Sequence, residues 1–230
     1  MNPETDRGRL RPKMLSFDVF GTLISVRDSS YGAFERILAD AGARHLDVKA
    51  FWEYWEHRNI AHYWEPYRSY REICELSLAE SFAHFEVAGD SRLIDRYFEA
   101  FPRFLLYDDV VRTLDRLSAR YKLAVVSNID DDLLARTPLQ RNFDLVCTAQ
   151  RAKGYKPDGT LFRYLIEHAG CAKEDILHSG QSQFTDLVGG KPLGLNIAWI
   201  NRREVALDAS VPRPDFILPD IQSLSRIVEM

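Results

Sequence analysis

Residues 15–23 read Leu15-Ser16-Phe17-Asp18-Val19-Phe20-Gly21-Thr22-Leu23, and the architecture of this 230-residue chain is built around them. They predict a short buried strand over residues 14–19 that ends at a carboxylate and turns at Gly21. A buried, ionised carboxylate is costly unless it is paired, bound to a metal or catalytic. Open α/β sheets also place their sites beyond the carboxyl ends of strands. Asp18 is therefore a candidate catalytic residue, although an aspartate that only caps the turn explains the stretch equally well.

The composition is typical of a globular protein, with 46% hydrophobic and 28% charged residues. The formal net charge of -4 gives no reason to expect a nucleic acid or a membrane as a partner. No run is long and apolar enough to span a bilayer. Cys74, Cys147 and Cys171 are scattered and odd in number, which is typical of reduced thiols. We expect a cytoplasmic protein that acts on a small molecule.

Residues 26–106 show helical patterns and no convincing strand. Ser29 and Ser30 are predicted to cap a first helix that ends near Gly42. Three further helices are predicted over residues 47–66, over residues 69–85 and after Gly89. We therefore predict two domains: a core of residues 1–25 and 107–230, and a helical domain of residues 26–106 inserted into it.

From residue 108 onward, short apolar strands alternate with helices. The strands are predicted at residues 123–126, 143–148, 176–178, 196–200 and 216–218. Such alternation predicts βαβ units, and hence an α/β protein with a Rossmann-like parallel sheet. Polar residues follow several strands: Asp18, Ser127, Asn128 and residues 180–183. We expect them to converge at one edge of the sheet, where a catalytic site would lie.

Four elements stand in a fixed order along the chain. They are Asp18 with Thr22, Ser127 with Asn128, the loop Tyr155-Lys156-Pro157-Asp158, and the segment from Gln181 to Asp186. This order resembles that of the haloacid dehalogenase (HAD) superfamily, and the resemblance covers nearly the whole chain. It implies the HAD fold, a Rossmann-like core with a helical cap domain inserted after the first strand.

The residue two positions after the nucleophile separates the branches of that superfamily. Phosphatase members usually carry a second aspartate there, whereas this chain has Phe20, which cannot transfer a proton. The resemblance therefore points to the L-2-haloacid dehalogenase branch. In these enzymes, also called (S)-2-haloacid dehalogenases, the leaving group is a halide ion, which departs without a proton. It implies that Asp18 displaces halide from C2 of a small 2-substituted acid. Water would then hydrolyse the aspartyl ester to give a 2-hydroxy acid, with no metal and no cofactor.

The resemblance also implies a role for each matching residue. Lys156 would keep Asp18 ionised, and Thr22 would hold it in place. Ser127 would donate hydrogen bonds to Asp18 or to the substrate, with Asn128 beside it as a substrate-binding residue. Asp186 would position Lys156 and help activate water. Without the resemblance, the same residues suit a strand-end cap, a surface lysine and a helix N-terminal aspartate.

The chain departs from the dehalogenase pattern at several positions. Gln181 stands where phosphatases carry a magnesium-binding acid, and an amide is a poorer ligand for that cation. Gln181 and Gln183 replace a serine and an asparagine, and we expect both to bind substrate. The cap arginine of the dehalogenases is absent, because Glu56 follows Trp55.

The nearest arginine to that cap position is Arg58, so we expect it to bind the substrate carboxylate or halide, although a solvated helix face fits it equally well. Phe20 is expected to line an apolar substrate pocket. The aromatic residues of 26–106 are compatible with a homodimer formed through the cap.

Three other functions stay open. A Mg²⁺-dependent phosphatase or phosphonate hydrolase would need the metal, and the phosphonate enzymes use a cap lysine, for which residues 26–106 offer only Lys49. A strained-ring acid such as L-azetidine-2-carboxylate would undergo the same attack at C2, but its leaving amine needs a proton. A binding module without activity is the third alternative, and it leaves the combination of Asp18, Lys156 and Asp186 unexplained.

Overall fold

A six-stranded parallel sheet forms the centre of the molecule in the computed structural model, which describes residues 10–228. Its strand order is β5-β4-β1-β6-β7-β8. The strands are β1 (Met14–Phe17), β4 (Lys122–Ser127), β5 (Leu145–Thr148), β6 (Ile176–Gly180), β7 (Asn196–Ile200) and β8 (Phe216–Leu218). The predicted α/β fold with a parallel sheet is confirmed.

Strand β1 lies in the middle of the sheet and fixes where the first motif lies. It pairs in parallel with β4 and β6, so that Phe17 lies opposite Val125 on one side and Ser179 on the other. The strand ends at Phe17, two residues before the predicted end, but the Asp18 N–H still donates to the Ser179 carbonyl at 2.9 Å. Asp18 is thus the first residue beyond the sheet edge.

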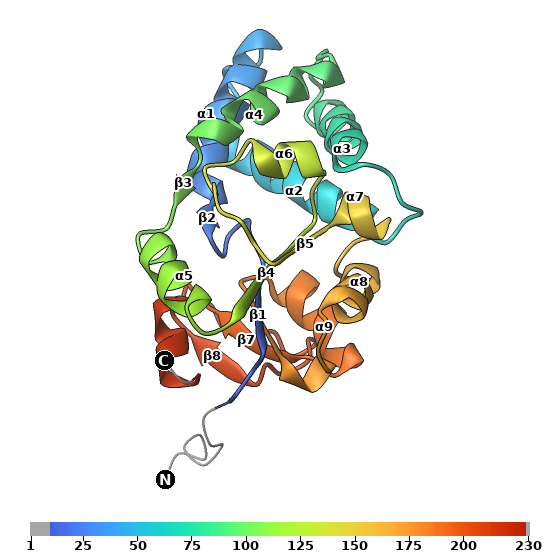
Figure 1. Cartoon of the computed structure of the whole chain (residues 1–230). Helices are drawn as coiled ribbons and strands as arrows, with labels where there is room; N and C mark the ends of the chain where they lie inside the picture. The colour runs from blue at the N-terminus through green and yellow to red at the C-terminus, as the bar shows by residue number, and fades with distance from the viewer. Residues whose placement is uncertain (1–9, 229–230) are drawn as a thin grey trace.

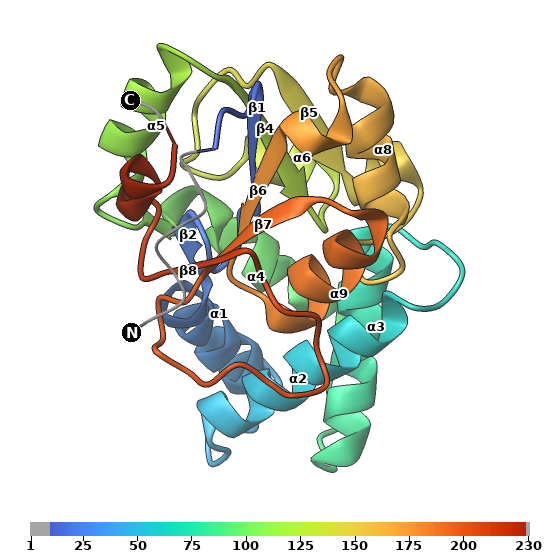
Figure 2. The ribbon, with the colours of Figure 1, turned by 90° about the horizontal axis from the view of Figure 1, so that it is seen from below.

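Helices cover both faces of the sheet (Figure 2). Helix α5 (Val110–Ser118) and the 3₁₀ helix Gln222–Arg226, which replaces the predicted closing helix, lie on one face with Leu15 and Phe17. Helices α8 (Thr160–His168) and α9 (Val188–Gly190) cover the other face. Because strand side chains alternate between faces, a sheet covered on both sides needs strands that are apolar throughout.

Four α-helices lie between β2 (Ile24–Ser25) and β3 (Leu105–Leu106), and we call them the insertion helices. They are α1 (Val26–Asp40), α2 (Val48–His62), α3 (Tyr70–His84) and α4 (Asp95–Ala100), and they lie above the carboxyl ends of the sheet strands (Figure 1). The short strands β2 and β3 pair antiparallel. The expectation that residues 26–106 contain no strand is therefore wrong at Leu105 and Leu106.

Helix α1 begins earlier than the predicted serine caps. Its N-cap residue is Ser25, which makes no side-chain capping bond. Ser30 lies inside the helix and donates to the Val26 carbonyl at 2.7 Å, while the Ser29 hydroxyl accepts from the Leu105 N–H at 3.3 Å. Both serines therefore satisfy backbone groups near the β2–β3 pair, and the predicted capping role is wrong.

A carboxylate from the sheet side caps helix α3. The helix has its own capping box, formed by Ser69 and Glu72. In addition, Asp130, which follows β4, accepts from the Tyr70 N–H at 3.0 Å and from the Arg71 N–H at 3.1 Å. Asp130 therefore joins the insertion helices to the loop that carries Ser127 and Asn128.

The two ends of the described chain lie together. The Leu10 N–H donates to the Ile227 carbonyl at 2.9 Å, and Leu10 forms a β-bridge with Val228. The remaining elements are α6 (Asp131–Ala135), α7 (Ala149–Ala152), the π-helix Gln183–Leu187, and short 3₁₀ helices at Ser91–Ile94, Phe101–Arg103, Lys173–Asp175 and Lys191–Leu193. Among residues 10–228, no helix is both long enough and apolar enough to cross a membrane.

Candidate active site

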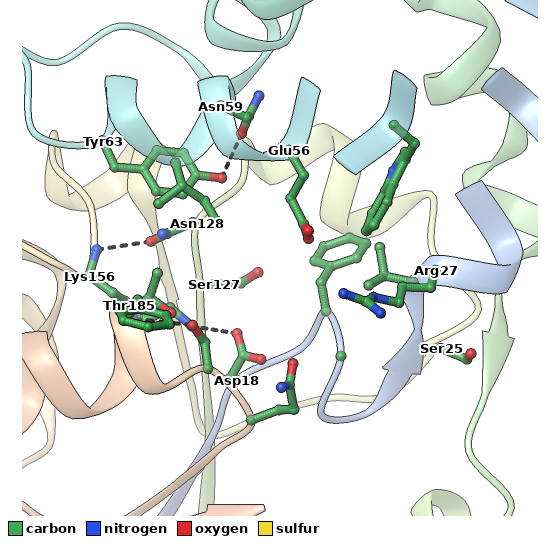
Figure 3. A pocket seen from close by; sticks show the side chains of 18 of the residues that line it. Asp18, Ser25, Arg27, Glu56, Asn59, Tyr63, Ser127, Asn128, Lys156 and Thr185 are labelled. Atoms are coloured by element: carbon green, nitrogen blue, oxygen red, sulfur yellow. Dashed lines mark hydrogen bonds and ion pairs between the residues drawn. The ribbon is translucent and has the colours of Figure 1, made fainter. Parts of the chain in front are cut away.

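Three buried charges meet beyond the carboxyl ends of β1, β4 and β6. The Lys156 ammonium donates to Asp18 Oδ1 and, at 2.8 Å, to Asp186 Oδ1. The exposed fractions of Asp18, Lys156 and Asp186 are 5%, 2% and 0%. Figure 3 shows Asp18 at the floor of a pocket under helix α2. The structure thus brings together the predicted nucleophile, lysine and acid.

Burial and pairing act in opposite directions on these charges. Burial raises the pKa of Asp18, and the neighbouring Asp186 adds to that effect, against the lowering effect of Lys156. Burial also disfavours the charge of Asp186, but Lys156 and His178 outweigh it and lower the pKa to about 2. Burial alone would lower the pKa of Lys156, yet the two carboxylates raise it. Asp186 therefore keeps its charge, and Lys156 is a fixed cation beside the nucleophile.

Thr22 holds the second oxygen of the nucleophile. Its hydroxyl donates to Asp18 Oδ2 at 2.7 Å and accepts from the Gln181 N–H at 2.9 Å. Because the other oxygen of Asp18 is bound to Lys156, the carboxylate cannot rotate without losing a hydrogen bond. The predicted positioning role of Thr22 agrees with this geometry.

Asp186 is held in place by hydrogen-bond partners other than Lys156 and by close packing against Gly180. Its Oδ1 lies 3.2 Å from His178 Nε2, and its Oδ2 accepts from the Ser182 N–H at 3.0 Å. The other ring nitrogen of His178 lies 3.0 Å from the Ser16 hydroxyl. A Cβ on Gly180 would lie 2.3 Å from Asp186 Cγ, so the carboxylate fits only beside a glycine. The sequence predicted a role for Asp186, but it did not predict that His178, Ser182 and Gly180 would hold its carboxylate in place.

The second motif follows β4, where Ser127 and Asn128 both line the pocket. Asn128 Oδ1 accepts from the Lys156 N–H at 3.0 Å, so this residue fixes the lysine loop. The Ser127 hydroxyl is buried and has no partner within residues 10–228. A buried polar group without a partner is costly, and here it is available to a bound substrate.

The pocket between the insertion helices and the sheet has a volume of about 470 Å³. Phe20 lines it and packs against Phe101, with ring centroids 5.7 Å apart. Trp55 of helix α2 and Tyr63, which directly follows that helix, also line it, and the Tyr63 hydroxyl donates to Asn59 at 2.7 Å. A pocket of this kind, apolar with a few polar groups, suits a small molecule.

Two predicted substrate-binding residues do not line the pocket. Arg58 points elsewhere and donates to Glu80 Oε2 at 2.7 Å. Gln183 donates to the Ala206 carbonyl at 2.9 Å and holds the loop that follows β7. Arg58 lies on the side of helix α2 that faces α3, where Glu80 is available, and Gln183 lies within the π-helix. Gln181, in contrast, does line the pocket.

Four charged residues outside the predicted motifs also line the pocket. They are Arg27, Asp28, Glu56 and Arg203. Burial raises the pKa of Glu56, although Arg27 and Arg203 oppose the change. Figure 3 shows Glu56 and Arg27 directed into the pocket. Arg27 follows β2 and Arg203 follows β7, so the rule that polar residues gather at strand ends applies to Arg203 as well.

The donor set near Asp18 is a poor fit for Mg²⁺. Both carboxylates accept hydrogen bonds from Lys156, and Gln181 supplies a neutral amide where a third acid would be needed. Within residues 10–228 there is no group of three His, Cys, Asp or Glu side chains that could hold a metal ion.

Known proteins of similar sequence and structure include several dehalogenases. The (S)-2-haloacid dehalogenase 4A of Burkholderia cepacia is 26% identical over 197 residues, which cover 81% of this chain and 82% of that protein. The L-2-haloacid dehalogenase structure from Xanthobacter autotrophicus matches with a TM-score of 0.80 at 22% identity, over 94% of this chain and 97% of that one. A magnesium-bound HAD hydrolase from Bacillus subtilis also has a TM-score of 0.80, at 18% identity, over 96% of this chain and all of that one.

The family comparison covers most of the chain. A model described as haloacid dehalogenase-like hydrolase matches residues 15–200, from β1 through β7. That span includes the first motif, the insertion helices, the Lys156 loop and the segment that contains Asp186. The resemblance inferred from the motifs is confirmed, and the chain belongs to the haloacid dehalogenase-like hydrolases.

Proposed function

We propose that this hydrolase displaces a leaving group, most simply halide, from C2 of a small 2-substituted carboxylic acid. The observation that carries the proposal is the nucleophile's setting. Asp18 is held by Lys156 and Thr22 on a pocket floor where Phe20 stands in place of a second acid. The relatives named as (S)-2-haloacid dehalogenases support the same chemistry.

In the first step, a carboxylate oxygen of Asp18 attacks C2 from the side opposite the halogen. The new C–O bond forms as the carbon–halogen bond breaks, and halide leaves with the bonding electron pair, so that no proton is required. Phe20 cannot donate a proton, and none is needed. The unpartnered Ser127 hydroxyl is placed to donate to the substrate.

In the second step, water attacks the Asp18 carbonyl carbon of the ester. The bond between that carbon and the substrate oxygen breaks, and that oxygen takes the bonding electron pair and one of the two protons of the attacking water. This regenerates the carboxylate and releases a 2-hydroxy acid with inverted configuration, while the other proton passes to solvent. Once Asp18 is esterified it carries no charge, so Lys156 then faces Asp186 alone. We assign to Asp186 the orientation of Lys156 and the acceptance of a proton from the attacking water.

Chloride release from L-2-chloropropionate tests the proposal. We expect release by the wild type that is unchanged by EDTA and lost in Asp18→Asn. Asp132→Asn is the matched control, because Asp132 is an exposed partner of Arg71 outside the pocket. In a single turnover in heavy-oxygen water, the label should enter Asp18 and not the product. Turnover of a phosphate or phosphonate that requires Mg²⁺, without chloride release, would contradict the proposal.

A second candidate function is favoured by one observation, the carboxylate of Glu56 in the pocket. Opening of L-azetidine-2-carboxylate would use the same attack by Asp18, with the ring nitrogen as leaving group. A positively charged ring nitrogen matches Glu56, whereas a halogen does not. Glu56→Gln separates the two candidates: it should raise KM for the ring acid and should not raise KM for the haloacid.

We further propose that residues 26–106 act as a cap domain on a core of residues 1–25 and 107–230. The pocket is lined from both parts, which supports this division, although residues 1–9 lie outside the described range. The three free cysteines support a cytoplasmic location.

A homodimer through the insertion helices would bury apolar side chains that are exposed in the monomer, such as Trp64, which is 58% exposed. Trp64→Ser should then weaken the dimer and lower the sedimentation coefficient.

A further inference from the structure

Two guanidinium groups in the pocket have no part in the proposed steps. Arg27 belongs to the first turn of α1 and Arg203 follows β7, and both line the pocket that contains Asp18. Within residues 10–228, neither forms an ion pair with a carboxylate. Like charges in one pocket repel each other. Glu56 and Asp28 share the pocket, but in the described part of the chain neither is paired with these guanidinium groups, so both arginines can still bind an anion.

The backbone that carries Arg203 is firmly held. The Asn201 side chain accepts from the Val205 N–H at 3.1 Å and donates to the Val205 carbonyl at 2.9 Å, which closes a tight turn. Inside the turn, Arg202 donates to the Thr22 carbonyl at 2.9 Å. Arg203 therefore projects from a turn that is tied directly to the loop of the nucleophile.

Each guanidinium also has one neighbour that orients it. The Arg203 Nη2 and Nε atoms lie 2.7 and 3.2 Å from the Gln181 amide oxygen, in the amide orientation that satisfies both groups. The Arg27 guanidinium lies 5.8 Å from the centre of the Trp52 ring. The Trp52 indole N–H is buried and has no partner in the described part of the chain. These contacts leave donors of both arginines available to a ligand.

We propose that Arg27 and Arg203 bind the carboxylate of the substrate and so direct C2 toward Asp18. The inference rests on the proposed function, and it gives these two residues the role that the sequence suggested for Arg58. A guanidinium matches a carboxylate in shape and charge. Asp18 and Asp186 carry two negative charges and Lys156 carries one positive charge, so the inner site alone would repel a negatively charged substrate. Positive groups elsewhere in the pocket are needed to bind its carboxylate.

Glu56 completes this group. Its carboxylate faces the same pocket and makes no hydrogen bond within residues 10–228, yet both arginines oppose the rise that burial causes in its pKa. Two arginines and Glu56 leave one positive charge, which a single carboxylate neutralises. Asp28 also lines the pocket, but it is exposed and accepts from the Ser25 hydroxyl at 3.4 Å. Glu56 is also a built-in competitor for the guanidinium groups, so Glu56→Gln should tighten the binding of a haloacid.

The test compares L-2-chloropropionate with its uncharged amide, L-2-chloropropionamide, in Arg27→Gln and Arg203→Gln. We expect kcat/KM for the acid to fall roughly tenfold or more in each variant, as loss of a charged hydrogen bond predicts. The amide should be turned over as before. Arg58→Gln is the matched control, because Arg58 is paired with Glu80 outside the pocket. It should leave kcat/KM unchanged for both substrates.

Equal losses with acid and amide would overturn the inference, since they would indicate a merely structural role. Unchanged kinetics with the acid would overturn it too. Binding separates this result from failure of the proposed function: the affinity of Asp18→Asn for L-2-chloropropionate is measured by calorimetry, with and without Arg203→Gln. Binding that the second substitution weakens roughly tenfold supports the inference even if the wild type releases no chloride. Equal or absent binding overturns it.

Discussion

Lys156 balances the buried charge of the site. It is buried between two carboxylates and bonded to each. Removing one partner from a buried ion pair leaves uncompensated charge in the interior, which is more costly than the pair itself is stabilising. Loss of the lysine therefore destabilises the fold, and in the proposed mechanism the same two contacts orient Asp18 for its attack.

Lys156→Met should abolish turnover and lower the free energy of unfolding by about 3 kcal/mol or more at pH 7. Without the lysine, the pKa values of Asp18 and Asp186 in the folded protein rise above their unfolded values. Such groups stabilise the fold at low pH and lose that effect as pH rises. The difference in free energy of unfolding between the variant and the wild type should therefore become smaller toward pH 4. Urea unfolding at several pH values measures this difference.

Lys153→Met is the control for that experiment, because Lys153 is exposed three residues earlier. Loss of its contact with the Tyr67 ring, 5.0 Å away, should lower the free energy of unfolding by about 0.5–1 kcal/mol at most, by the same amount at every pH. A Lys156→Met deficit that stays constant with pH would mean that lost packing, and not uncovered charge, destabilises the variant.

At the scale of elements, helix α9 is pressed against the loop that carries Lys156. A Cβ on Gly189 would lie 1.7 Å from the Lys156 carbonyl oxygen, a backbone atom that cannot turn away. Gly189→Ala must therefore move the helix or the lysine loop. We expect a loss of about 1–3 kcal/mol in the free energy of unfolding, together with a lower kcat.

Gly32→Ala is the matched comparison in helix α1, where nothing lies within 4 Å of the added carbon. It should stabilise the protein by roughly 0.5–1 kcal/mol, because alanine favours the helix interior. Chloride release should be unchanged. If both variants behaved alike in urea unfolding and in activity, the close approach at Gly189 would have no consequence.

The elements also show which features can be predicted from a sequence. The apolar strands and the polar residues that follow them were predictable, because burial and chain direction alone place Asp18, Ser127 and Gln181 at one edge. Asp186 was predicted only through the family resemblance. The start of α1 was not, since Ser29 serves a residue 76 positions away along the chain. Arg58 illustrates the same limit. Its helix was correctly predicted, but whether its side chain points into the pocket or pairs with Glu80 depends on how α2 and α3 pack.

At the scale of the whole molecule, the insertion helices and the sheet are joined at Asp130. This carboxylate is 4% exposed and accepts from two N–H groups at the start of α3. Asp130→Ala should lower the free energy of unfolding by about 1–2 kcal/mol, as loss of a helix cap does. Because the pocket lies between the two parts, KM should rise as well.

Ser69→Ala removes a cap of the same helix that lies entirely within the insertion. It should cost a similar amount of stability and leave KM as it is. Urea unfolding and initial rates measured on the two variants decide the matter, and equal KM values would show that Asp130 stabilises α3 without holding the pocket together.

The contact of Leu10 with Ile227 and Val228 has a consequence for engineering. A linker between these two segments would not have to bend the fold, and folds of this kind tolerate circular permutation. New ends would belong at an exposed turn of the insertion, such as the one at Glu86. In such a permuted enzyme the chain from Asp186 to Asp18 would run through the linker and would be shorter than before, and a shorter connection loses less freedom when its two ends come together on folding.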